Sequence, residues 1–275
     1  MLKILVPVDF SPESNNALQY AIKMATAADK AVITIYHAIY IKDVMADLLE
    51  KVKDVLIEET ERELAAILKK CEDKDLSNTT FKTLHSFDYP DESILKIAAE
   101  HKKDVVIMGT KGTSGLEKIF IGSVASKVIE KAKIPVLVVP EEYNSSRQKI
   151  KEIMFASDLE NIDVRIKLVV ALAKLFNAEI LILHVLPESS NLVLNAEKIV
   201  TDLIEKHHYD KIKFFSLMES SIEKGIEKFI EDKSPDLIVM YPHKRTFLEK
   251  LLSYSKTRNM AEKAEVPVLA VPSLS

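Results

Sequence analysis

Short apolar runs and longer helical patterns alternate along the first half of the chain. The runs are typical of buried strands, and between them apolar residues recur every three or four positions, as in amphipathic helices. Strands are expected at residues 3–8, 31–37, 79–84, 104–108 and 135–139, and helices at 12–28, 43–70, 90–101 and 122–131. Strands alternating with helices predict βαβ units and a parallel sheet with right-handed crossovers.

The pattern starts again after a polar segment at residues 141–149. The strand expected at 150–157 is followed by Asp158, as the first strand is followed by Asp9. The closing segments align without a gap, because residues 135–140 recur as residues 267–272, an offset of 132. This internal duplication predicts two similar α/β domains, at residues 1–140 and 150–275, joined by a linker at 141–149. The second long helix is expected to be shorter, at 191–207.

The fifth strand of each half is apolar on both faces, which is unusual for an open sheet edge. These strands are expected at residues 136–139 and 268–271. We predict that they pair with each other or with another copy of the chain. The two halves would then form a pseudo-dimer within the chain, and a homodimer is the alternative.

Glycine is concentrated in one stretch. The chain has five glycines in 275 residues, and four of them lie between positions 109 and 122. A strand comes before this stretch and a helix begins at its end, so free N–H groups and the helix dipole would face the same point. The pattern favours a phosphate site, most simply for a nucleotide, over a purely structural loop.

Composition and charge narrow the class of protein. The net charge of −4, with no basic block, argues against a general nucleic-acid surface. No apolar run approaches the ~20 residues that a membrane helix needs, and the N-terminal segment resembles a strand rather than a signal peptide. The single cysteine, Cys71, excludes an intramolecular disulfide and fits a reducing compartment. We therefore expect a cytoplasmic protein with no nucleic-acid or membrane partner.

These features together resemble the universal stress protein family in its tandem two-domain form. The most specific match is the family's nucleotide pattern, in which glycine, two residues, glycine and nine residues precede Gly-Ser. Gly109, Gly112 and Gly122-Ser123 satisfy that spacing. The resemblance implies two doubly wound domains, each with a five-stranded parallel sheet in the order 3-2-1-4-5 flanked by helices. It also implies an ATP site at the carboxyl ends of strands 1 and 4, where the strand order reverses.

The resemblance further assigns roles around the nucleoside. Asp9 would hold the ribose hydroxyls, and the backbone at Ala38 and Met108 would face the adenine edge. Gly109 and Gly112 would let the loop wrap the ribose and the α-phosphate. From the sequence alone, Asp9 could instead help to cap the first helix.

The remaining roles concern the phosphate tail. Gly122, Ser123 and Val124 would present N–H groups to it, together with the Ser123 hydroxyl. This agrees with the helix-terminus anion site expected from the glycine pattern. Lys111 stands where the family often has His or Arg, so it either pairs with phosphate or is solvated.

The second half departs from the nucleotide pattern. At the offset of 132, the four clustered glycines are replaced, in order, by Tyr241, Lys244, Phe247 and Tyr254. Only Asp158 and Ser255, the counterpart of Ser123, persist. We predict that this domain has lost ATP binding, although His243, Lys244 and Arg245 could attract another anion.

Other candidate residues point to ordinary structural roles. His37 and His184 stand at equivalent strand ends, where packed or solvated histidines are common. The adjacent His207 and His208 would face different directions on a helix, which argues against a metal site. Cys71 resembles an incidental thiol rather than a redox sensor.

No catalytic motif is found in the sequence, so we expect neither catalytic nor metal-binding residues. The preferred hypothesis is a regulatory protein of stress adaptation that binds ATP, with or without Mg²⁺, and has an unidentified protein partner. One alternative is a slow Mg²⁺-dependent ATPase or phosphotransferase. The other is a nucleotide-free interaction protein.

Overall fold

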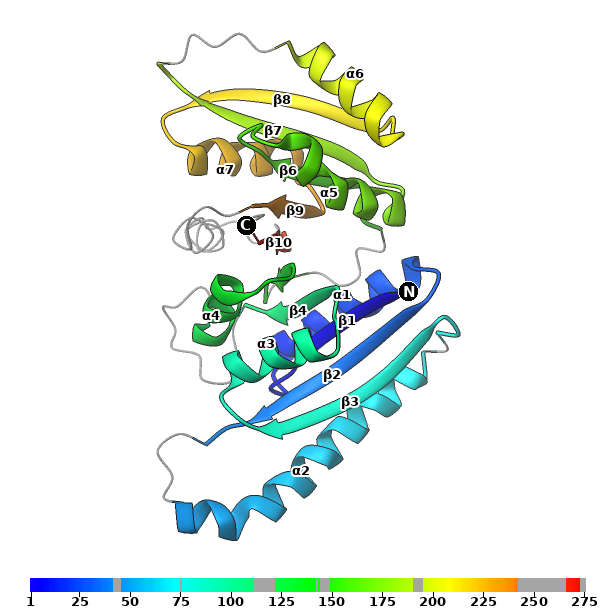
Figure 1. Cartoon of the computed structure of the whole chain (residues 1–275), viewed down its shortest axis with the longest axis vertical. Helices are drawn as coiled ribbons and strands as arrows, with labels where there is room; N and C mark the ends of the chain where they lie inside the picture. The colour runs from blue at the N-terminus through cyan, green and yellow to red at the C-terminus, as the bar shows by residue number, and fades with distance from the viewer. Residues whose placement is uncertain are drawn as a thin grey trace. The chain divides into compact units, whose positions relative to one another are not determined.

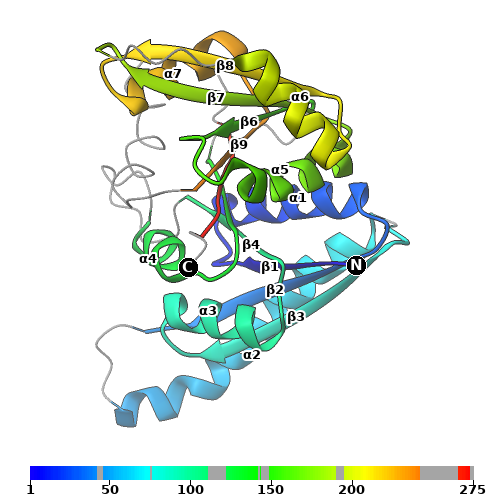
Figure 2. The same cartoon turned by 45° about the horizontal axis from the view of Figure 1, so that its top comes forward.

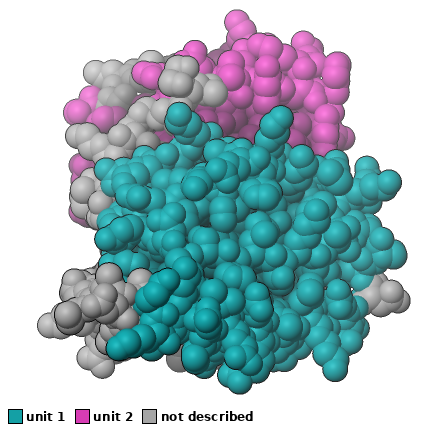
Figure 3. Space-filling model, turned by 60° about the horizontal axis from the view of Figure 1, so that its bottom comes forward, with its two compact units in different colours: residues 1–141 teal, residues 142–275 magenta. Residues whose placement is uncertain are grey.

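A computed structural model divides the chain into two compact units, Met1–Glu141 and Glu142–Ser275 (Figure 3). The structure describes residues 1–41, 46–74, 76–110, 122–141, 143, 149–189, 195–241 and 266–272. Each unit is described by itself below.

The first unit is built on a parallel sheet. Its described strands are β1 (Leu2–Pro7), β2 (Ala31–Ile39), β3 (Thr79–Phe87), β4 (Val105–Gly109) and β5 (Val136–Val139) (Figure 1). They lie in the order β3-β2-β1-β4-β5, and each neighbouring pair is parallel. The second and third strands extend two or three residues beyond the ranges predicted from the sequence.

Helices connect these strands and cover the sheet. They are α1 (Pro12–Ala27), α2 (Ala46–Glu72), α3 (Pro90–Glu100) and α4 (Ser123–Lys131). Right-handed crossovers place α1 and α2 on one face and α3 and α4 on the other. α1 runs back along β1 (Figure 2), and α3 packs beside α4.

The second unit repeats this architecture. Its described strands are β6 (Glu152–Ala156), β7 (Glu179–Pro187), β8 (Ile212–Glu219), β9 (Leu237–Met240) and β10 (Val268–Ala270). Its described helices are α5 (Ile162–Phe176), α6 (Ala196–His207) and α7 (Ile222–Lys233). The strands are parallel in the order β8-β7-β6-β9-β10, which is the same order as in the first unit. The predicted fold class is therefore confirmed.

The start of α1 shows how directly the sequence sets local structure. Ser11 is the N-cap, and its hydroxyl accepts a hydrogen bond from the Ser14 N–H at 3.2 Å. Pro12 stands at the first helical position and Glu13 in the first turn, where each is favoured. The predicted N-terminus of this helix is confirmed.

Both sheets are buried as parallel sheets require. Ile4, Leu5 and Val6 on β1 are fully buried, and so are Ile153 and Phe155 on β6.

The long helix α2 has 27 residues and its counterpart α6 has 12, so the predicted difference in length is confirmed. Pairing of the fifth strands, β5 and β10, stays a prediction.

One buried cation stands out in the first core. Lys103 is only 7% exposed, and its ammonium group donates a hydrogen bond to the Thr34 hydroxyl on β2. Burial lowers the pKa of Lys103, and the nearby Lys82 and Lys3 lower it further, while Asp104 acts in the opposite direction. The charged form is therefore less favourable in the folded chain than in water.

Replacing Lys103 with methionine should stabilise the first unit by about 1 kcal/mol at neutral pH, since it removes a buried charge but keeps the volume. The folded chain binds fewer protons than the unfolded chain between the lowered pKa and the unfolded value of about 10.4. Wild-type stability should therefore rise with pH in that window, and the advantage of the variant should shrink. Urea titrations at neutral and alkaline pH would measure this.

The exposed neighbour Lys102 provides the matched control, because Lys102→Met should change stability little at either pH. A Lys103→Met variant less stable than wild type at neutral pH would contradict the prediction.

Candidate functional site

The strands β1 and β4 separate before their carboxyl ends. Their ladder comprises two residue pairs, Ile4 with Val105 and Leu5 with Val106, although β1 continues to Pro7 and β4 to Gly109. This is the point where the strand order reverses, and ligands of doubly wound sheets bind there. The first unit thus has the strand arrangement that the predicted site requires.

Proline gives a physical reason for this separation. Along β1, Leu2 and Val8 donate their N–H groups toward β2, to the carbonyls of Lys30 and Tyr36. Because N–H groups alternate between the two sides of a strand, residue 7 would donate toward β4. Pro7 has no N–H group, so the ladder lacks a donor at that position.

The second unit differs at this position. Ala156 stands in place of Pro7, and the β6–β9 ladder comprises four pairs that run to Ala156 and Met240. The two middle strands therefore stay paired to their carboxyl ends. The Pro7/Ala156 difference is visible in the aligned repeats, but the sequence does not show that residue 7 faces β4.

Asp9 follows β1 and organises the turn into α1. Its Oδ1 atom accepts hydrogen bonds from the Ser11 N–H at 3.2 Å and from the Ser11 hydroxyl at 2.5 Å. This turn encloses Phe10, whose φ of 64° is unusual for a bulky residue. Asp9 therefore has a structural role in the turn, and a ribose contact would be additional to it.

His37 links the ends of β1 and β2. Its Nδ1 atom lies 2.7 Å from the Val8 carbonyl oxygen, which can only accept, so Nδ1 carries the proton. The ring stacks on Phe10 with centroids 4.4 Å apart. Burial and, to a smaller extent, the nearby His85 lower the pKa of His37 more than the Val8 hydrogen bond and Asp9 raise it, so the neutral ring is favoured at pH 7. These contacts fit a packed histidine.

The two positions predicted to face adenine lie on the strands beside this turn. Ala38 is inside β2 and pairs with Ser86 of β3. On its other side the β1–β2 ladder has already ended, at Pro7 and Tyr36. Met108 is 6% exposed and lies on β4 beyond the last pair with β1. Both residues thus lie beyond the last residue pair that their strands form with β1.

Gly109 has a packing reason to be glycine. A Cβ atom there would lie 3.0 Å from the backbone carbon and oxygen of Glu13 in the first turn of α1. The close contact between β4 and α1 therefore favours glycine whether or not a ligand is present. Gly225, inside α7, is constrained similarly, because its Cβ would lie 2.6 Å from a Val185 methyl carbon.

The amino terminus of α4 lies beside the end of β4. The Gly122 N–H donates to the Thr110 carbonyl at 2.6 Å, which corrects the expectation that this N–H faces the phosphate tail. The first intrahelical bond is from Ser126 to Gly122, so the N–H groups of Ser123, Val124 and residue 125 precede it. The N-cap residue, Gly122, has no side chain that could cap this end.

Gly122 has no conformational reason to be glycine. Its φ of −58° and ψ of 150° are accessible to any residue. Serine, aspartate or asparagine would cap α4 at this position. Because the N-cap residue is glycine, no side chain of its own competes with an external anion for the N–H groups of α4.

A buried carboxylate holds α4 in place. Asp91, in the first turn of α3, has an 8% exposed side chain and lies 3.5 Å from Lys127 Nζ and 3.7 Å from Lys131 Nζ. The two lysines are one turn apart on α4. Their contacts tie α4 to α3 and hold its amino terminus beside β4.

Parts of the predicted site lie outside the described residues. Gly112 and Lys111 of the glycine stretch are among them, and so are the second-unit counterparts Lys244, Phe247, Tyr254 and Ser255 together with His243 and Arg245. Of the predicted set, Asp9, Ala38, Met108, Gly109, Gly122, Ser123 and Val124 are described. These seven come from the ends of β1, β2 and β4 and the start of α4.

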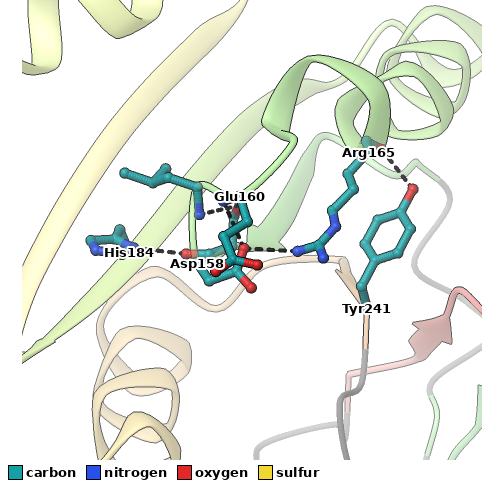
Figure 4. Close-up of polar contacts among 7 residues, drawn as sticks. Asp158, Glu160, Arg165, His184 and Tyr241 are labelled. Atoms are coloured by element: carbon teal, nitrogen blue, oxygen red, sulfur yellow. Dashed lines mark hydrogen bonds and ion pairs between the residues drawn. The ribbon is translucent and has the colours of Figure 1, made fainter. Parts of the chain in front are cut away.

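The equivalent place in the second unit holds an ion pair. Asp158 Oδ1 accepts hydrogen bonds from the Glu160 N–H at 2.9 Å and from Arg165 Nη1 at 2.7 Å (Figure 4). His184 Nδ1 lies 2.9 Å from the Ser157 carbonyl, which repeats the contact of His37. The Asp turn and the histidine contact are therefore features of the repeated fold.

The remaining candidates offer no further site within the described residues. Cys71 is buried, and burial raises the pKa of its thiol, which disfavours the reactive thiolate. Among the side chains that the structure describes, no group of three or more His, Cys, Asp or Glu could hold a metal ion. No helix in that part of the chain has the length and apolarity needed to cross a membrane.

Comparison with known proteins decides the family. The sequence profile of the Universal stress protein family matches residues 1–140 and again residues 150–272. The chain belongs to the universal stress protein family. The resemblance noted in the sequence is confirmed, including its tandem form.

Individual universal stress proteins support this assignment. One from Methanocaldococcus jannaschii is 35% identical over 144 residues, covering 50% of this chain and 81% of the relative. A second from the same organism is 32% identical over 154 residues, covering 50% and 93%. The solved structure of a universal stress protein from Archaeoglobus fulgidus covers 98% of both chains with a TM-score of 0.77. At 19% identity, that likeness shows the fold alone.

Proposed function

We propose that the first unit binds ATP at the carboxyl ends of β1 and β4, and that the second unit does not. The chain would be a regulatory member of its family, in which ATP sets assembly or the affinity for a protein partner. A ligand can do this when it prefers one of two states. The nucleotide would come with or without Mg²⁺.

The observation that carries the proposal is the amino terminus of α4, whose N-cap residue is glycine. The N–H groups of Ser123 and Val124 precede the first helical bond, and the Gly122–Thr110 contact holds them beside the end of β4. Such a terminus attracts anions through its free donors and its dipole. A phosphate tail is the anion that would also place a nucleoside near Asp9.

Contacts within the first unit connect the proposed ribose and phosphate positions. Asp9 organises the turn that leads to Glu13, and Glu13 packs on Gly109. Thr110 follows Gly109 and accepts from Gly122. One ligand spanning this path would contact the ends of β1, β4 and α4 together.

Binding without rapid turnover fits the groups at the proposed phosphate end. Backbone N–H groups and the Ser123 hydroxyl stabilise negative charge. Phosphoryl transfer would also need a residue that orients the attacking group and, usually, a carboxylate that holds a metal ion. We assign neither role to a residue of this chain.

The test is to purify the full chain, denature it and identify any released nucleotide. ATP should be released, or should titrate into the emptied protein with one site per chain. Incubation with ATP, with and without Mg²⁺, should leave most of it unconverted over many minutes. The proposal would be contradicted if no nucleotide were released and no ATP binding could be titrated. Fast Mg²⁺-dependent formation of ADP would favour an ATPase.

A further inference from the structure

Arg165 on α5 is fixed at the carboxyl end of β6 by several contacts. Its guanidinium pairs with Asp158 at 2.7 Å, with the two side chains 14% and 34% exposed. The centre of the guanidinium lies 5.4 Å from the centroid of the Tyr241 ring, within the range of a cation–π interaction. The Tyr241 hydroxyl donates to the Arg165 carbonyl oxygen at 2.8 Å (Figure 4).

Tyr241 is itself held in the second unit. Its ring lies edge-on to the buried Phe155 of β6, with centroids 6.2 Å apart. Burial raises the pKa of Tyr241 more than Arg165 lowers it, so its hydroxyl stays protonated and can donate. Arg165 is thus pinned by a carboxylate on one side and a fixed aromatic ring on the other.

The first unit has different residues at the positions that correspond to Arg165 and Tyr241. Asn16 stands seven residues after Asp9, as Arg165 stands seven residues after Asp158. The Asn16 amide donates to the Glu141 carbonyl at 2.7 Å instead of to the aspartate. Gly109 stands where the second unit has Tyr241, so this position of the first unit carries no aromatic side chain.

We infer that Arg165 is the residue that excludes a nucleoside from the second unit. Its guanidinium occupies the Asp158 carboxylate on which ribose hydroxyls would depend, and Tyr241 fills the place left by the missing glycine. The inference rests on the proposed function, which puts the ribose at Asp9.

Energetics favour an internal partner over a ligand here. A charged hydrogen bond between partly buried groups is stronger than a surface ion pair, and the ring restricts the arginine further. A nucleoside that displaced Arg165 would leave a partly buried guanidinium without its carboxylate, which is costly. The neutral ribose hydroxyls would then donate to Asp158 in place of the charged guanidinium, which is the stronger donor.

The first experiment asks whether the pair holds in solution. Asp158→Asn, Arg165→Gln and the double variant are compared by thermal unfolding of the full chain. Each single change should lower the unfolding temperature of the second unit, and the double change should lower it little further, because both remove the same interaction. Additive shifts would overturn the inference.

The second experiment transplants the arginine into the first unit. Asn16→Arg should weaken binding of both ATP and adenosine by about 10-fold or more, through a new pair with Asp9. The matched control is Asn16→Gln, which changes the Glu141 contact without adding a charge and should bind nearly as wild type.

The outcomes separate this inference from the proposed function. An arginine that only attracted phosphate would strengthen ATP binding and leave adenosine unchanged, which would overturn the inference alone. Equal affinities of Asn16→Arg and Asn16→Gln would do the same. A wild-type chain that bound no ATP would overturn both the proposed function and the inference.

Discussion

Replacing Gly122 with aspartate should nearly abolish ATP binding without destabilising the first unit. Aspartate is a better N-cap than glycine by a few tenths of a kcal/mol, and the φ and ψ of residue 122 suit it. Its carboxylate would accept hydrogen bonds from the N–H groups of the first turn of α4 and place negative charge where we propose the phosphate tail. A loss of about 100-fold in affinity corresponds to roughly 2.7 kcal/mol, within the range of one close charge repulsion.

Isothermal titration with ATP and with adenosine would measure this effect. Adenosine lacks phosphates, so its affinity should change little, whereas a general disruption of the site would weaken both ligands. Tyr254→Asp provides the matched control, because residue 254 is the counterpart of residue 122 in the second unit. Unchanged ATP affinity in Gly122→Asp, or an equal loss in the Tyr254 variant, would contradict the proposed site.

The repeat made the fold predictable but left the meaning of some shared residues ambiguous. The alternation of apolar runs and helical patterns was sufficient for parallel βαβ units, whereas the strand order was an implication of the family resemblance. The persistence of Asp158 beside a loop without glycines was unexplained. In both units this aspartate accepts from the N–H two residues later, around Phe10 or Leu159 with φ of 64° or 68°. The fold uses the aspartate even where we expect no nucleotide.

Gly109 and Gly122 differ in how strongly each one indicates a ligand. The cluster pointed to a ligand, yet the close approach of Glu13 already favours glycine at position 109, whereas the φ and ψ of Gly122 suit any residue. Sequence spacing cannot separate these cases, because both glycines stand at the predicted intervals. The distinction depends on which backbone atoms approach from α1.

Two further features depended on three-dimensional register. In the sequence, Arg165 is indistinguishable from an ordinary polar residue on a helix. The structure shows that its guanidinium contacts Asp158. In the sequence, Pro7 marks only the end of a strand. The hydrogen bonds of β1 show that the missing N–H of Pro7 is on the side facing β4. The Pro7/Ala156 difference was available from the aligned repeats, whereas the Arg165 contact required the positions of the side chains.

Asp9→Asn is expected to weaken both ATP and adenosine, in contrast to the change at Gly122. Asparagine keeps an oxygen that can accept from the Ser11 N–H and hydroxyl, so the turn into α1 should persist. The substitution removes the charge that would strengthen hydrogen bonds from the ribose hydroxyls. Hydrogen bonds to charged groups contribute about 1.5–3 kcal/mol, so affinity should fall by roughly 10-fold to 150-fold.

The sugar provides the most specific readout of that change. If Asp9 holds the ribose, the wild-type chain should prefer ATP to 2′-deoxy-ATP, and Asp9→Asn should lose most of this preference. Asp158→Asn is the matched control, since Asp158 is paired with Arg165 and should leave ATP affinity unchanged. A preference that survived in Asp9→Asn would show that the ribose is held elsewhere, and Asp9 would then serve the turn alone.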